Sequence, residues 1–203
     1  MMSEQTPEQR MDELMDELLE LLEEKVQDEE NLELLEAYRE REGATDEQLD
    51  AFEQHYGIRL PADLRAFYKR KNGSGYAFHV LFPGDAAQNE DHVFYMLSLE
   101  QMQQENDGTV EIRMQDYFTP EEMHELDPRI KPYLHQRSWI IFGKLGGGSL
   151  YLMLDFDPTE QGTYGQIIMF EHDPDFVYYV AQTFTELLEQ SNRNLREIEM
   201  IEY

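Results

Sequence analysis

The chain has 203 residues, and its 44 acidic and 16 basic side chains give a formal net charge of −28. This negative field repels phosphate backbones and attracts basic proteins, so we expect a basic protein partner and no direct nucleic-acid binding, unless the charge only serves solubility or a salt-adapted proteome. The absence of cysteine excludes disulfide bonds and thiolate sites and fits a reducing compartment.

The length and the N-terminus indicate how the chain is organised. A chain of this size can bury one sizeable core, so a single domain with an appendage is expected. The N-terminus lacks the basic and apolar regions of a signal peptide, and no apolar run approaches the roughly 20 residues of a membrane span. We expect a cytoplasmic protein with no membrane partner.

Residues 1–42 form an acidic segment with an apolar stripe, holding 16 Asp and Glu against 4 Lys and Arg. Thr6-Pro7 is typical of a helix start. The stripe recurs at helical spacing through Met11, Met15, Leu18 and Leu22, and it resumes at Leu32, Leu34, Leu35 and Tyr38. It must be buried on the main domain or on another chain. We predict an amphipathic helical extension, with self-association through residues 1–42 as one use for it.

Residues 45–75 predict two short helices joined by a turn. Thr45 and Gln48 match a capping box, and Gly57 suits the end of the first helix. Pro61 suits the first turn of the second helix, and Asn72-Gly73 suits its end.

The rest of the chain, residues 76–203, reads as strands with fewer helices. Strands are predicted at residues 76–82, 92–97, 138–143, 149–156 and 165–170, with a hairpin around the glycines 146–148. A helix is predicted from Asp173-Pro174 through residue 190, and residues 105–137 are interpreted as an insertion. This order predicts an α+β fold, with a single largely antiparallel sheet flanked by helices in a domain of residues 43–203.

Two patterns suggest chemistry. Residues 155–159, DFDPT, match the DxDxT pattern of haloacid-dehalogenase-like phosphotransferases, in which two aspartates act with magnesium. That chemistry needs a parallel sheet, so a turn capped by Asp155 is preferred. A calcium or magnesium site is suggested by acidic residues on neighbouring strand ends, namely Asp155, Asp157, Glu171, His172 and Asp173. No EF-hand spacing is present, so we expect neither a metal nor another cofactor.

Four stretches, in this order, resemble the SUKH superfamily, which includes fungal cell-wall-assembly regulators and many bacterial immunity proteins. They are residues 60–75 (LPADLRAFYKRKNGSG), 139–157 (WIIFGKLGGGSLYLMLDFD), 165–173 (GQIIMFEHD) and 180–190 (VAQTFTELLEQ). The resemblance spans about residues 45–190. It implies an α+β fold without a catalytic centre, and therefore a protein that is not an enzyme.

The resemblance also implies a function, because bacterial members typically neutralise a polymorphic toxin, often a nuclease, by binding it. The expected function is thus that of an immunity protein against a basic toxin. An intracellular regulatory or scaffold protein of the same fold is the alternative, and a magnesium-dependent phosphotransferase at Asp155 and Asp157 is a remote one. The predicted partner face comprises strand-end and loop residues, unless the acids are only a solvated rim: Asp155, Asp157, Glu171, Asp173, Tyr164, Asp85, Glu90 and Asp91.

Overall fold

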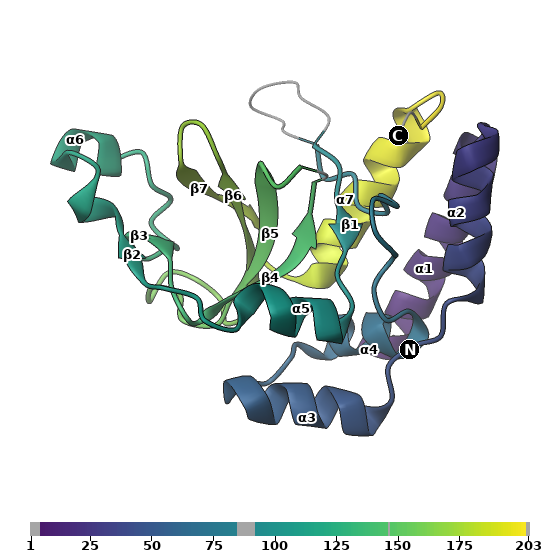
Figure 1. Ribbon diagram of the computed structural model, residues 1–203, viewed down its shortest axis with the longest axis horizontal. Coiled ribbons are helices and arrows are strands. Elements are labelled where there is room, and N and C mark those ends of the chain that lie inside the picture. The colour runs from purple at the N-terminus through teal and green to yellow at the C-terminus, as the bar shows by residue number, and fades with distance from the viewer. Residues whose placement is uncertain (1–4, 85–91, 146, 202–203) are drawn as a thin grey trace.

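The computed structural model describes residues 5–84, 92–145 and 147–201. Its helices and strands are shown in Figure 1 and have these bounds: α1 (Pro7–Lys25), α2 (Glu29–Glu40), α3 (Asp46–Tyr56), α4 (Ala62–Arg70), β1 (Tyr95–Met96), α5 (Leu99–Asn106), β2 (Ile112–Arg113), the 3-10 helix η1 (Met114–Asp116), α6 (Pro120–Met123), β3 (Tyr133–His135), β4 (Trp139–Lys144), β5 (Leu150–Asp155), β6 (Gln166–Glu171), β7 (Phe176–Ala181) and α7 (Phe184–Glu197).

The centre of the fold is a five-stranded antiparallel sheet in the order β1-β4-β5-β6-β7. The strands are apolar almost throughout because both faces are buried. In β5, Leu152 and Leu154 join one core cluster while Met153, between them, joins another. Ile167 and Ile168 divide in the same way in β6, as expected where successive side chains alternate between faces. The predicted α+β fold with an antiparallel sheet is confirmed.

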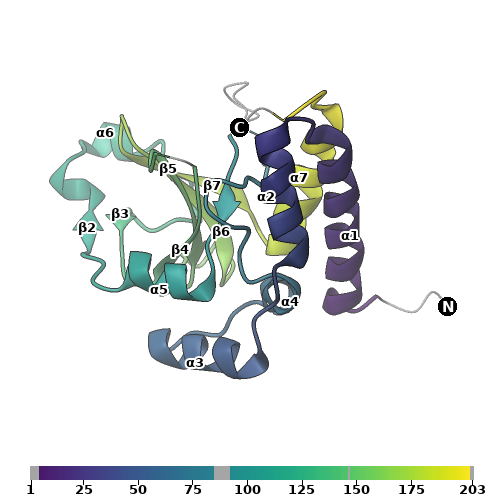
Figure 2. The ribbon, with the colours of Figure 1, turned by 45° about the vertical axis from the view of Figure 1, so that its right-hand side comes forward.

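Helices cover one face of the sheet. α7 contacts β6 and β7, α5 contacts β4, and α1 packs outside them against α4 and α7 (Figures 1 and 2). Met11, Leu18 and Leu22, from the stripe of the N-terminal segment, are fully buried in this core. Most of the stripe therefore packs on its own chain, whereas Leu32 is 42% exposed.

The other face of the sheet is covered by the segment that contains β2, η1, α6 and β3, which lies opposite α1 and α7 in both ribbon views. β2 and β3 pair as a separate two-stranded antiparallel sheet. Met114, Ile130 and Leu134 from this segment form a second core cluster with Trp139 and Met153 of the main sheet. The region interpreted as an insertion thus contributes directly to the core.

Local signals fixed the helix starts. Both halves of a capping box form at the N-termini of α1, α3, α5 and α6, from Thr6, Thr45, Ser98 and Thr119 respectively. Gly57 ends α3 with φ 66°, in the left-handed region that glycine adopts at least cost.

Two predicted elements differ in the structure. The predicted helix after Asp173 is wrong in its first half, because residues 176–181 form β7 and α7 begins only at Phe184. The run FVYYV is rich in aromatic and β-branched residues, and pairing with β6 outweighs its helical spacing. The strand predicted at residues 76–82 contributes only one bridge, between Leu81 and Phe94.

Candidate partner-binding face

The acidic residues of the predicted partner face lie at two opposite ends of the β5–β6 hairpin. Asp155 is paired with Gln166, and Leu150 with Glu171. Five residue steps at about 3.4 Å each therefore place roughly 17 Å between Asp155 and Glu171 along the strands. The acids suggested to lie on neighbouring strand ends are therefore separated, because consecutive antiparallel strands end at opposite ends of their hairpin.

Asp155 does not belong to an exposed face. Its side chain is fully buried, where Oδ1 accepts a 2.9 Å hydrogen bond from the backbone N–H of Asp157 and Oδ2 accepts one of 2.9 Å from Nε2 of Gln166. Burial raises the pKa of this carboxyl group. Asp155 therefore holds the turn after β5 in place, which corrects its assignment to the partner face.

Asp157 and Tyr164 stay at the surface near this same end. The Asp157 carboxylate pairs with Nζ of Lys131 at 2.6 Å. Tyr164 is half exposed, its ring packs 5.1 Å from that of Phe156, and its hydroxyl accepts a hydrogen bond from the backbone N–H of Arg59. Tyr164 also borders an open hollow of about 550 Å³ beside the end of α3. These two residues remain candidates for partner contact.

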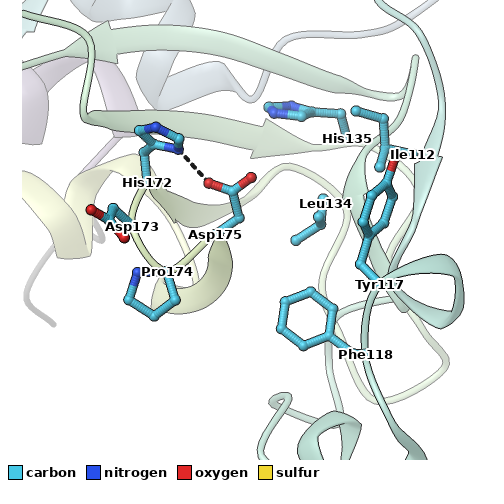
Figure 3. Close-up of a pocket in the computed structure, with 9 residues that line it drawn as sticks. All are labelled: Ile112, Tyr117, Phe118, Leu134, His135, His172, Asp173, Pro174 and Asp175. Atoms are coloured by element: carbon cyan, nitrogen blue, oxygen red, sulfur yellow. Dashed lines mark hydrogen bonds and ion pairs between the residues drawn. The ribbon is translucent and has the colours of Figure 1, made fainter.

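Glu171 and Asp173 lie at the other end of the hairpin, where the β6–β7 turn faces the segment of β2, η1 and β3. A pocket of about 460 Å³ opens between them (Figure 3). We call it the turn pocket, and it is lined by Ile112, Tyr117, Phe118, Leu134, His135, His172, Asp173, Pro174 and Asp175. Of the predicted partner-face residues that the structure describes, Asp173 alone lines it, together with His172, which the sequence suggested only as part of a metal site.

Apart from Asp173 and His172, the residues of the turn pocket were not predicted from the sequence. Tyr117 and Phe118 follow η1, and His135 ends β3, with its ring 4.7 Å from that of Phe170. The pair of adjacent aromatic residues within an acidic, polar stretch was a usable signal, whereas the position of Asp175 opposite them depends on the fold. The remaining predicted residues, Asp85, Glu90 and Asp91, lie outside the described residues.

Most of the 16 Lys and Arg side chains are used in ion pairs within the chain. The shortest pairs include Arg10 with Glu189 at 2.6 Å, Arg129 with Asp127 at 2.7 Å, and Arg70 with Asp16 at 2.8 Å. Others are formed by Lys25, Arg39, Arg59, Arg65, Lys69, Arg113, Lys131, Lys144 and Arg196. The surplus of acidic side chains is left to the surface.

That surplus is densest on the outward faces of α1 and α2. The exposed acids there are Glu8, Asp12, Glu13, Asp16, Glu20, Glu23, Glu24, Glu29, Glu30, Glu33, Glu36 and Glu40. Since most of the apolar stripe faces inward, the surface that the N-terminal helices present to other molecules is mainly acidic.

The described residues show no other obvious chemistry. Among them, no group of three or more His, Asp or Glu side chains is arranged to hold a metal ion. Nor does any helix within the described ranges have the length and apolarity needed to cross a membrane.

Comparison with known proteins places this fold in a family. A comparison with curated proteins finds no match. The sequence model of the SMI1 / KNR4 family (SUKH-1) matches residues 43–190, which is more than two thirds of the chain, and the match runs from the link before α3 into α7. The chain therefore belongs to the SMI1 / KNR4 family (SUKH-1).

Proposed function

We propose that this chain is a non-catalytic protein-binding module that neutralises a basic, nuclease-type toxin by covering the surface with which the toxin binds nucleic acid. The observation that carries this proposal is the internal use of the chain's cations, which leaves a surface dominated by carboxylates. A nuclease presents a basic surface to phosphates, and an acidic protein is drawn to such a surface at an enhanced rate.

The proposal is tested first by capture from the native host. The tagged full chain is used as bait, bound proteins are eluted with a salt gradient, and each fraction is analysed by mass spectrometry. We expect one basic protein in equimolar amount. Exposed charge pairs weaken as the Debye length falls from about 10 Å at 0.1 M salt to about 3 Å at 1 M, so its affinity should fall steeply between these conditions.

The captured protein is then assayed for nuclease activity. Inhibition that is complete at one equivalent of this chain supports the immunity function. A partner whose activity is unchanged by a saturating amount of this chain contradicts it, even if the two proteins bind tightly.

A regulatory or scaffold function of the same fold is the second candidate. It is favoured by Leu32, which is 42% exposed on α2 among acidic neighbours and gives this helix an apolar contact point. Capture of several host proteins, weakened by Leu32→Ser and insensitive to salt, would support this function over the first.

Catalysis at Asp155 and Asp157 has less support. Asp155 would have to be the nucleophile, yet it is fully buried and both of its oxygens accept hydrogen bonds from the chain itself. We place the protein in the cytoplasm, in keeping with a chain that has no cysteine.

A further inference from the structure

We propose that the turn pocket binds an arginine side chain of a basic partner protein. The identity of the partner rests on the proposed function, but the chemistry of the pocket is independent of it and is tested separately below. The pocket volume of about 460 Å³ falls within the range of about 300–1,000 Å³ that is usual for ligand pockets.

The pocket has an aromatic wall and a carboxylate wall. Figure 3 shows Tyr117 and Phe118 on one side, Asp173 and Asp175 on the other, and Leu134 between them. Tyr117 is 71% exposed, so much of its ring is free to contact another molecule. Phe118 is held more firmly, with its ring 5.9 Å from that of Phe176.

The charge of the pocket selects a cation. Neither lysine nor arginine occurs among the described residues that line it. Burial lowers the pKa of His135, although Asp175 acts in the opposite direction, so this imidazole is neutral near pH 7. Asp175 contacts Nδ1 of His172 through Oδ1, and a carboxylate has further lone pairs with which it can accept hydrogen bonds.

The chain already holds one of its own arginines with the same groups. Arg129 donates hydrogen bonds to both oxygens of Asp127, at 2.8 and 2.7 Å, and its Cζ lies 3.2 Å from the centre of the Tyr179 ring on β7. The turn pocket offers a tyrosine and a carboxylate without such an arginine. A planar guanidinium satisfies both groups at once, by stacking on the ring and donating to the carboxylate, whereas an ammonium group lacks the planar fork.

The test uses N-acetyl-L-arginine amide as the probe and NMR of the full chain, labelled on histidine and tyrosine. We expect saturable shifts of the His172, His135 and Tyr117 signals, with a dissociation constant in the millimolar range. The matching citrulline compound, which has the same shape but no charge, should bind at least tenfold more weakly. Equal shifts with citrulline, or no saturable shift with arginine, would overturn the proposal.

Two substitutions, each with a matched control, locate the site. Tyr117→Leu should weaken binding of the probe at least threefold, whereas Tyr76→Leu, at a tyrosine that is 72% exposed elsewhere, should not. Asp175→Asn should weaken it likewise, whereas Asp157→Asn, at the other end of the hairpin, should not. Each variant is accepted only if its melting temperature stays close to that of the wild type, and an effect of the controls equal to that of the pocket variants would contradict the assignment.

The two proposals fail separately. If the arginine compound binds but the capture experiment yields no basic partner, the proposed toxin-neutralising function is contradicted, whereas the proposed arginine site in the turn pocket is supported. If a basic partner binds wild type and Tyr117→Leu with the same affinity, the proposed function is supported, but the turn pocket does not take part in that interface.

Discussion

The buried side chain of Asn192 on α7 donates a 3.0 Å hydrogen bond from Nδ2 to the backbone carbonyl of Leu14 on α1. The same nitrogen also donates to Oε2 of Glu17 at 3.0 Å. Hydrogen bonding thus adds to apolar packing where the N-terminal extension meets the last helix of the fold.

Asn192→Ala should loosen α1. Removing a buried hydrogen-bond donor leaves its acceptors unsatisfied, so we expect a loss of about 1–3 kcal/mol in the free energy of unfolding, measured by urea denaturation. Arg193→Ala, at the exposed neighbouring position, is the control and should have little effect. Equal losses of unfolding free energy in both variants would show that the hydrogen bonds of Asn192 do not specifically stabilise the packing of α1.

Leu18→Ala tests whether the apolar stripe of the N-terminal helices packs against the domain of the same chain. Leu18 is fully buried, and truncation of such a leucine costs about 2–5 kcal/mol. The unfolding midpoints of wild type and variant should not depend on protein concentration, because this packing lies within one chain. Glu20→Ala on the exposed face is the control. A midpoint that rises with concentration in the wild type would support self-association through residues 1–42.

Asp155→Ala separates a structural role from a binding role. The change removes the acceptor of the Asp157 N–H and one of the two acceptors of the Gln166 amide, so the free energy of unfolding should fall by about 1–3 kcal/mol. Partner affinity should not change as long as the variant is folded. Asp157→Ala removes a surface ion pair, which is worth about 0–1 kcal/mol. If Asp155→Ala weakens binding while stability is unchanged, Asp155 returns to the partner face.

His135 predicts a pH dependence of stability. Burial lowers the pKa of its imidazole in the folded state, so the unfolded chain binds the proton more readily than the folded one. The wild type should therefore lose stability relative to His135→Gln as the pH falls from 7.5 to about 5.5, through the unfolded pKa of about 6.5.

For this single proton, the difference is at most about 1.4 kcal/mol per pH unit. The quantity to measure is the difference between the urea-unfolding free energies of the two proteins at each pH. His124→Gln, at an exposed position, is the control. A difference that is constant with pH would show that the folded and unfolded chains bind this proton equally, so that folding does not lower the pKa of His135.

The fold was predictable where local chemistry decides it. Thr6-Pro7 was predicted to start a helix and Thr45 with Gln48 to form a capping box, and α1 and α3 begin at these positions. β7 was missed because the side chains of Phe176 and Val180 fit a helix face equally well. Only the pairing of β7 with β6, which residues 176–181 do not determine by themselves, favours a strand over a helix here.

The site was less predictable because it depends on strand direction and on distant contacts. A largely antiparallel sheet was predicted, and antiparallel pairing of the strands that end in Asp155 and Glu171 already places these two residues at opposite ends of the strands. The turn pocket could not be predicted from strand direction alone. Tyr117 and Asp175 line the same pocket only because the segment of β2, η1 and β3 covers the sheet.

The separation of the two hairpin ends also determines how substitutions there combine. Sites more than about 7–10 Å apart with no shared partners usually have additive effects within about 0.5 kcal/mol, and the ends are roughly 17 Å apart at about 3.4 Å per residue. A double variant such as Asp157→Asn with Asp175→Asn therefore reports the geometry of a bound partner. Suppose that each single change weakens partner binding and that the loss of affinity in the double variant is the product of the two single losses. One partner then contacts both ends of the hairpin through independent contacts.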